Sequence, residues 1–155
     1  MRWNKSQKYI SIILSAACFV FSIEGTRASL TKSGTLPAKL EKLYKIVDFA
    51  KGDVLNLIQG YNEVGIITNE KNLGKIMKAI EFEVILFTET GLVLIALTMS
   101  REHLYTPGII YQPVRKLFLD NVNIYEIIFT ELIFIINGKD AVRAYNSLQE
   151  LTSQK

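Results

Sequence analysis

The stretch IEFEVILFTETGLVLIALTM, Ile80 to Met99, decides the fold of this chain. It is the most apolar part of the sequence after the first thirty residues. A buried central helix, a β-hairpin, a membrane-spanning segment and a lipid-contacting surface would all use a run of this kind. Each of these structures implies a different class of function, so the rest of the sequence has to select among them.

The periodicity around this stretch favours a helix. Asn69 can cap the helix at its start, and up to Glu83 the face opposite the apolar residues is charged. After Glu83 the run is apolar on nearly all sides, which is typical of a helix enclosed by others or by lipid. The apolar positions step by four and three: Leu73, Met77, Ile80, Val84, Phe87, Gly91, Leu94 and Thr98.

A β-hairpin at residues 84–95 is the alternative. Two strands, 84–87 and 92–95, would flank a turn at 88–91, and the β-branched residues and Gly91 favour it. Neither arm alternates polar with apolar residues, so we expect the helix. The hairpin would make the fold α+β.

Three further segments carry helical spacing. The first begins with Thr35 and Pro37 as start signals, and its seam reads Leu36, Leu40, Leu43, Val47, Ala50, Val54, Leu57 and Tyr61. The others span residues 113–136 and 139–151, the last with Ala141, Tyr145, Leu148 and Leu151 facing inward. We therefore predict an all-α protein, a four-helix up-down bundle whose second and third helices are central. It would form a single helical domain at residues 36–152, after a flexible lead-in at 29–35.

The N-terminus resembles a secretory signal peptide in its layout. A basic opening precedes an apolar run, Tyr9 to Ile23, and small residues follow before Ser29. We predict a signal peptide at residues 1–28 and a secreted, extracellular protein. An uncleaved anchor is one alternative. The other is a bacterial lipoprotein, lipidated at Cys18 in the run Leu14 to Cys18.

Removing residues 1–28 changes the charge and the cysteine content. The segment holds four basic residues and one acidic residue, so totals of 18 and 15 become 14 of each sign. A neutral chain lacks the basic surface that binds nucleic acid. The one cysteine is also removed, so the mature form would be cysteine-free and without disulfides.

No catalytic or cofactor motif occurs in the sequence. Zinc-ligand spacing, a nucleophile elbow and glycine-rich phosphate loops are all absent. The single histidine, His103, lies at an expected helix end, where its partial charge suits the helix dipole. We predict no enzyme activity, no cofactor and no metal.

Two acidic residues with apolar neighbours are the candidate binding residues. On a helix Glu89 and Glu131 would each have four apolar residues at a spacing of three or four. A carboxylate in such surroundings needs a partner or becomes protonated. In the structural explanation, each carboxylate lies at the edge of the bundle or pairs with a lysine or tyrosine of another helix. The functional alternative is a polar anchor in an apolar pocket or a protein interface.

The same stretch makes a poor resident membrane span. Nine strongly apolar residues between Val84 and Leu97 would gain about 3–5 kcal/mol on insertion, and Glu89 would cost about 3 kcal/mol. Glu81, Glu83 and three threonines add to the cost. Insertion under special conditions, with Glu89 protonated or buried in an oligomer, stays open.

These observations predict a secreted, non-enzymatic binding or interaction protein. Its partner would be a lipid-like ligand or a hydrophobic protein surface, with no role for nucleic acid. The alternative is a membrane-active protein whose second and third helices insert or form a pore. The sequence predicts no particular oligomeric state.

Overall fold

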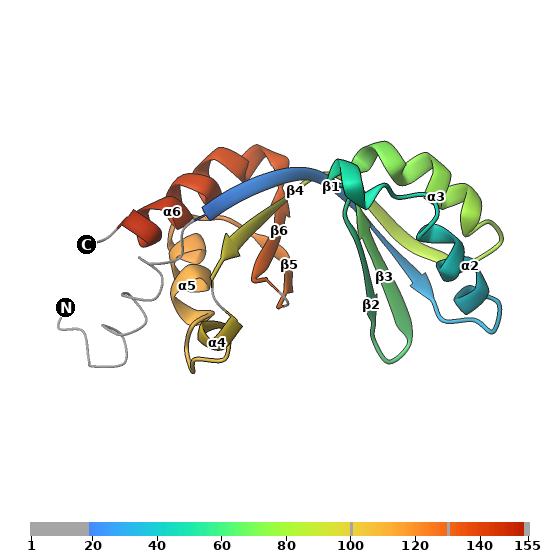
Figure 1. Cartoon of the computed structure of the whole chain (residues 1–155), viewed down its shortest axis with the longest axis horizontal. Helices are drawn as coiled ribbons and strands as arrows, with labels where there is room; N and C mark the ends of the chain where they lie inside the picture. Colours follow the sequence, from blue (N-terminus) through green and yellow to red (C-terminus); the bar gives the residue numbers. More distant parts are fainter. Residues whose placement is uncertain (1–18, 100, 130, 154–155) are drawn as a thin grey trace. The chain divides into compact units, whose positions relative to one another are not determined.

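The computed structural model describes residues 19–99, 101–129 and 131–153, and it is an α+β protein (Figure 1). Six strands occur in the order β2-β3-β1-β4-β6-β5. The helices are short, and α6, the longest, has 13 residues. The predicted all-α four-helix bundle is therefore wrong.

The deciding stretch is mainly one strand, β4 (Ile85–Thr98). Leu92 and all residues from Leu94 to Leu97 are buried, so both faces of this part are covered. A strand covered on both faces has no reason to alternate polar and apolar residues, and its composition then matches that of a buried helix. The hairpin alternative predicted the correct fold class, α+β. Its turn is wrong, because residues 88–91 continue the strand.

The chain divides into two compact units. The inserted unit comprises Glu24–Leu92, and the outer unit comprises Met1–Ile23 and Val93–Lys155. Two strands, β1 (Phe19–Thr31) and β4, each contribute residues to both units. The chain thus starts in the outer unit, builds the inserted unit and returns through β4.

The inserted unit has the element order β-α-β-β-α-β. Its helices are α2 (Leu36–Leu43) and α3 (Leu73–Ala79), and its inner strands are β2 (Leu55–Gln59) and β3 (Glu63–Thr68). Strand β3 pairs antiparallel with both β1 and β2, and Ile66 lies opposite Ala28 on one side and Leu57 on the other. The order within the unit is β2-β3-β1-β4.

The two helices cover one face of this sheet. Leu30 lies opposite Val64 in the register, so both side chains point to the same face as the Ile66 row. These strand residues form a core with α2 and with the end of α3. The buried residues are Leu30, Leu36, Leu40, Leu43, Val64, Ile66, Ile76 and Ile80.

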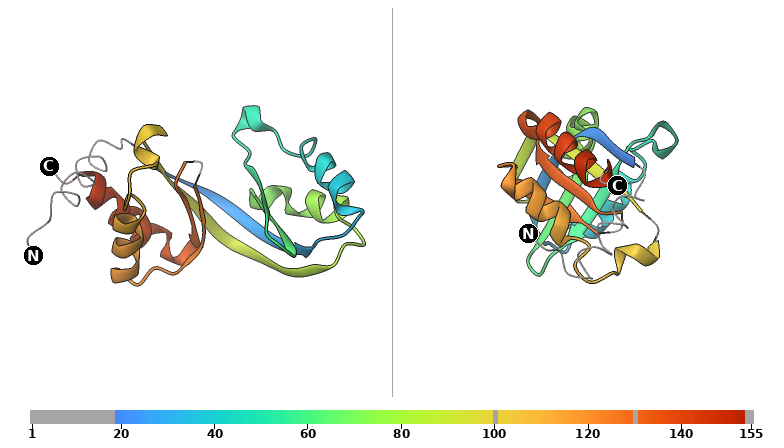
Figure 2. Two further views of the ribbon diagram at one scale, coloured as in Figure 1. Left: turned by 90° about the horizontal axis from the view of Figure 1, so that it is seen from below. Right: turned by 90° about the vertical axis from the view of Figure 1, so that its left-hand side faces the viewer.

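The outer unit repeats this arrangement with a different chain path. It contains α4 (Arg101–Leu104), α5 (Tyr111–Leu119), β5 (Ile124–Ile128), β6 (Ile133–Asn137) and α6 (Ala141–Ser153). Strands β5 and β6 form an antiparallel hairpin, and α5 and α6 lie next to each other (Figure 2). The order is β1-β4-β6-β5, so the N-terminal part of β1 occupies the position that β4 has in the inserted unit.

Most of the predicted helices are replaced by shorter elements. The seam from Leu36 to Tyr61 is helical only in α2; a 3-10 turn, Phe49–Lys51, and β2 follow it. Gly52 ends this turn with φ 79°, a left-handed conformation that suits glycine. Segment 113–136 contains the end of α5 and the β5–β6 hairpin. The segment 139–151 is helical from Ala141 on, and Leu148 and Leu151 face inward as expected, whereas Tyr145 is 38% exposed.

The predicted signal peptide conflicts with β1. Cleavage before Ser29 would remove residues 19–28, which are most of this strand, and Thr26 and Ala28 are buried in the sheet. The structure thus uses residues 19–28 in the sheet, whereas the predicted signal peptide itself stays a prediction. The predicted lead-in also begins inside β1. Residues 1–18, including Cys18, lie outside the described residues, and the extracellular location and the lipidation alternative stay predictions.

No helix in the described part of the chain has the length and apolar character needed to cross a membrane. The expected membrane-active pair of helices is also absent there, because its two segments form β4 and the β5–β6 hairpin. That alternative function is therefore wrong.

Candidate functional site

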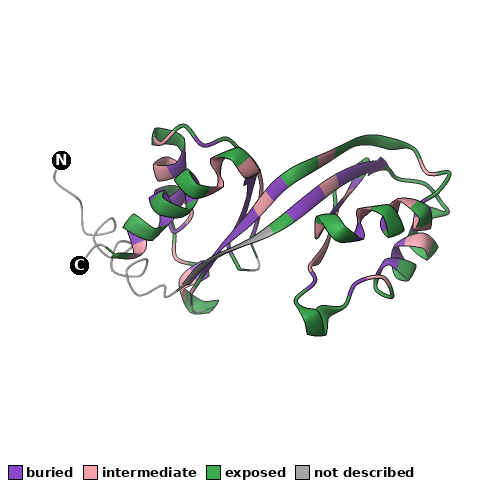
Figure 3. Cartoon of the chain, turned by 90° about the horizontal axis from the view of Figure 1, so that it is seen from above, coloured by how far each residue is buried: buried purple, intermediate pink, exposed green. Residues whose placement is uncertain are grey.

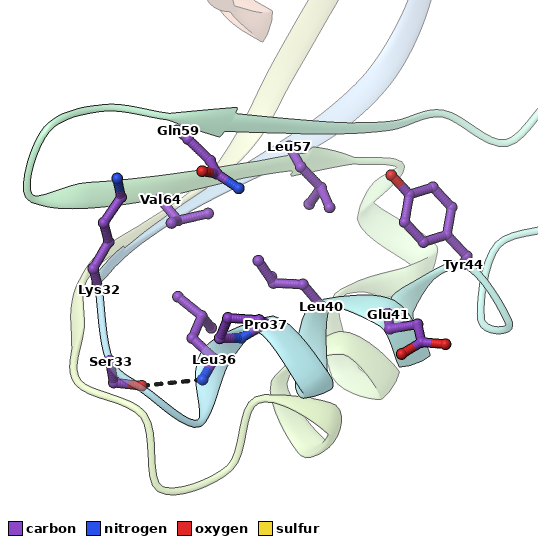
Figure 4. Close-up of a pocket in the computed structure, with 10 residues that line it drawn as sticks. All are labelled: Lys32, Ser33, Leu36, Pro37, Leu40, Glu41, Tyr44, Leu57, Gln59 and Val64. Atoms are coloured by element: carbon purple, nitrogen blue, oxygen red, sulfur yellow. Dashed lines mark hydrogen bonds between the residues drawn. The ribbon is translucent and has the colours of Figure 1, made fainter.

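A pocket of 420 Å³ opens in the inserted unit between α2 and the strands β2 and β3. Its floor is apolar because it is the edge of the core described above. Leu36 and Leu40 reach it from α2, and Leu57 and Val64 reach it from β2 and β3 (Figure 4). The volume suits a small organic molecule, since ligand pockets are typically of this order.

Polar groups surround this floor at the pocket rim. Lys32 and Ser33 stand at one end, and Glu41 and Tyr44 stand at the other (Figure 4). Gln59 adds a side-chain amide from the end of β2. A cation at one end, hydrogen-bonding groups around the rim and an apolar floor would suit a small amphipathic molecule.

The main chain holds Lys32 in place, whereas its ammonium group makes no ion pair within the described part of the chain. The Lys32 N–H donates to Asn62 O at 3.0 Å. This bond fixes the connector between β1 and α2, residues 32–35, against the β2–β3 turn. The Lys32 side chain is exposed and makes no ion pair with any residue that the structure describes. A charge with no partner at a pocket mouth is available to an anionic ligand group.

The other end of this connector is fixed by Glu83. Ser33 Oγ accepts from the Leu36 N–H at 3.1 Å and so caps α2, although Thr35 was the predicted cap. Glu83 accepts hydrogen bonds from Ser33 and from Thr35, the latter at 2.6 Å, and pairs with Lys39 at 2.8 Å. These bonds, with the one from Lys39 the largest cause, lower the pKa of Glu83 to about 2. The anionic carboxylate therefore locks the segment that bears Lys32 and Ser33.

A second hollow, of 460 Å³, lies nearby around Asp53 and is lined mainly by charged groups. Asp53 accepts from the Asp48 N–H at 3.0 Å and from Asn72 Nδ2 at 2.9 Å, and it pairs with Lys71. These bonds, led by that from Lys71, lower the pKa of Asp53. Because Asp53 is already fully engaged, this hollow is a structural junction between two loops and a poorer ligand site.

Glu89 lies on β4, outside both hollows. Its carboxylate pairs with Arg27 Nη1 at 3.4 Å, and its main-chain O accepts from Thr26 Oγ1 at 2.6 Å. The Arg27 guanidinium lies 4.9 Å from the centre of the Phe87 ring. The partner expected for this carboxylate therefore comes from the neighbouring strand, as an arginine instead of a lysine or tyrosine of another helix.

Glu131 is exposed in the turn between β5 and β6, and it belongs to the other unit. The structure thus does not place the two predicted residues in one pocket, and their binding role stays a prediction. His103 lies on α4 and is partly buried. Within the described residues no cluster of three or more His, Cys, Asp or Glu could hold a metal ion.

The sequence pattern does not predict the pocket residues, for a physical reason. The spacing of apolar residues predicts Leu57 on a helix. In the structure Leu57 lies on the strand β2 and lines the pocket opposite α2. The signal that was present is the turn Gly60–Asn62 between two short segments with aliphatic residues, which is typical of a hairpin. Lys32 and Ser33 lie in a connector, where periodicity says nothing about contacts.

Comparison with known proteins gives matches among solved structures alone. No family model matches the sequence, and no curated protein matches it. The chain resembles a chain of the aspartokinase alpha and beta subunits, with 13% identity and a TM-score of 0.69, over 89% of this chain and 99% of that chain. The regulatory subunit of aspartate kinase from Thermus thermophilus gives 14% identity and a TM-score of 0.65, over 85% and 95%.

A longer protein matches in part. The aspartate kinase of Clostridium acetobutylicum gives 20% identity and a TM-score of 0.69, over 86% of this chain and 34% of its own. The likeness is one of fold. This chain and these aspartate kinase chains share their architecture. The predicted function, a binding or interaction protein for a lipid-like ligand or a hydrophobic protein surface, does not agree with this fold and is wrong. The predicted location and partners stay predictions.

Proposed function

We propose that the chain is a regulatory protein that senses a small molecule through the pocket between α2, β2 and β3. The observation that carries the proposal is the extent of the structural match. The chain covers 95% and 97% of the regulatory subunits of aspartate kinase from two Thermus species, so it corresponds to whole regulatory chains. ACT-like domains typically bind amino acids.

The pocket supports the same proposal from its chemistry. Lys32 can pair with a carboxylate, and Gln59 can donate to or accept from a polar group. Leu40 and Leu57 provide the apolar surface that a ligand side chain would cover. Such a site would bind and position a molecule, and the role that we propose is non-enzymatic.

A ligand panel tests the proposal directly. The purified full-length chain is screened against the twenty amino acids by thermal shift, and each hit is measured by calorimetry. We expect one or a few amino acids to bind, because a ligand that binds the folded state alone raises the melting temperature. Lys32→Ala should weaken the binding of a hit at least tenfold, since it removes the cation facing the carboxylate.

Lys78→Ala is the matched control, because Lys78 is an exposed lysine of α3 that does not line the pocket. It should leave binding unchanged. A folded chain that binds no amino acid at millimolar concentration would overturn the amino acid as ligand. A hit whose affinity is equal in both variants would overturn the assigned pocket.

A further inference from the structure

The hollow around Asp53 contains three lysine side chains from three helical segments. Lys51 ends the 3-10 turn described above, Lys71 lies on a second 3-10 turn, Glu70–Asn72, and Lys75 lies on α3. For the amphipathic ligand of the pocket this hollow is the poorer site, because its lining is mainly charged. The lysines suit a different class of ligand.

Two of these lysines are neighbours on one helical segment. Leu73 has helical dihedral angles, φ −52° and ψ −49°, so the second 3-10 turn runs directly into α3. Lys71 and Lys75 are four residues apart, a spacing at which side chains lie close together and like charges repel. Along this segment Asn72 and Ile76 are the buried residues, and both lysines are exposed (Figure 3). A bound anion would remove the repulsion between them.

The two aspartates of the hollow are already paired. The Asp53 side chain is only 4% exposed, and it accepts from the Asp48 N–H and pairs with Lys71. Asp48 pairs with Lys51 at 3.2 Å, but both side chains are well exposed, so this ion pair is weak and easily rearranged. Lys75 makes no ion pair with any residue in the described ranges. The hollow therefore offers one unpaired ammonium group and two that keep spare N–H donors.

We propose that this hollow binds a phosphate-bearing anion, with Lys51, Lys71 and Lys75 contacting the phosphate oxygens. Lysine binds phosphate as a point charge, and each ammonium group can donate three hydrogen bonds. The buried Asp53 carboxylate positions these cations, because it holds Lys71 directly and holds the turn that carries Lys51 through the Asp48 N–H. The volume of 460 Å³ accommodates free phosphate, pyrophosphate or the phosphate chain of a nucleotide.

This anion site is separate from the ligand pocket. The two hollows share no lining residue, so the proposal goes beyond the proposed function and does not depend on it. An amino acid that fills the pocket should therefore not compete with a phosphate compound.

Titrations of the full-length chain with inorganic phosphate, pyrophosphate and ADP test the proposal. They are followed by thermal shift and by backbone-amide chemical shifts, at an ionic strength held constant with sodium chloride because salt screens exposed charges. Pyrophosphate should raise the melting temperature and bind more tightly than phosphate, because it carries more charge. The amides of Lys51 and Lys75 should shift, whereas that of Ser33 in the pocket should not.

The ADP titration distinguishes the sources of the phosphate group. An affinity for ADP at least equal to that for pyrophosphate would support a nucleotide as the ligand. A much lower affinity for ADP would support a free phosphate compound at the same site.

Lys75→Gln should weaken the binding of pyrophosphate about fivefold, the effect of one unit charge about 4 Å away in a water-like dielectric. The ligand-free melting temperature of this variant should stay the same or rise slightly, because the repulsion with Lys71 is removed. Lys42→Gln is the matched control, because Lys42 is an exposed lysine of α2 that lines neither hollow. Its affinity for pyrophosphate should equal that of the wild type.

Two results would overturn the proposal. The first is that millimolar pyrophosphate changes neither the melting temperature nor the amide shifts beyond the effect of sodium chloride. The second is equal affinity in Lys75→Gln and Lys42→Gln, since the anion would then bind elsewhere on the chain.

Discussion

Two leucine-to-alanine substitutions in the same small core should differ in cost because one of them borders the ligand pocket. Leu30 on β1 is fully buried, and Leu40 on α2 is 7% exposed and lines the pocket. Each substitution removes three carbons, which at about 0.8 kcal/mol per buried methylene amounts to about 2.4 kcal/mol. At Leu30 a closed cavity remains, and its lost contacts raise the total to between about 3 and 5 kcal/mol.

At Leu40 the vacated space joins an existing opening that water already reaches. The cavity contribution is then small, and the free energy of unfolding should fall by about 2 kcal/mol. The measurement is urea unfolding followed by circular dichroism, with the two midpoints compared at constant slope. Leu40→Ala should lie between the wild type and Leu30→Ala.

Equal losses at the two positions would refute the reasoning. They would mean that the site at Leu40 is as closed as that at Leu30, so that no pocket opens between α2 and β2. A second check comes from any ligand found in the panel. Its affinity should change in Leu40→Ala, which enlarges the pocket floor, and should stay the same in a Leu30→Ala chain that remains folded.

Three further predictions concern charges and backbone conformation. Because folding lowers the pKa of Glu83 from 4.5 to about 2 and also lowers that of Asp53, the unfolded chain binds more protons in acid. The stability from Glu83 is complete above pH 4.5 and is lost as the pH falls toward 2; urea midpoints across this range should drop, and less steeply in Glu83→Gln. Phe82 has φ 68°, a left-handed conformation. Phe82→Gly relieves this conformation, which costs about 1–2 kcal/mol, and adds flexibility worth about 0.5–1 kcal/mol, so its thermal midpoint should equal or exceed that of the wild type; a clear fall would show that the ring supports the fold. Ser147→Ala removes the hydroxyl that donates to Asp120 between α6 and the end of α5, and urea unfolding should show a loss of about 1 kcal/mol; no loss would mean that water replaces this bond.

The sequence predicts local features of this fold better than its class. Pro37 marks the start of α2, and the final helix lies near its expected place, because start signals and spacing act within one turn of helix. The segment from Leu94 to Leu97 has the composition of a helix although it forms a strand, because residues buried on both faces of a strand show no alternation. Spacing by four and three then arises by chance in so apolar a segment.

The candidate site was harder to predict than the helices. The pocket needs Leu57 and Gln59 of β2 opposite α2, and this juxtaposition depends on pairing between strands that are distant in sequence. Glu89 was singled out correctly as a carboxylate in need of a partner. Its partner, Arg27, comes from a segment that the signal-peptide prediction had removed from the protein.

The path of the chain through β1 and β4 sets an order in which the protein can fold. The inserted unit ends at Leu92, so all of its strands exist once that residue has been synthesised. The outer unit must wait for α6 and must also keep residues 19–23 available, which lie about seventy residues before the rest of its chain. Closing so long a loop is entropically costly unless its ends are already held near each other. Formation of the inserted unit brings β1 and β4 together, so it should act as the template on which the outer unit assembles.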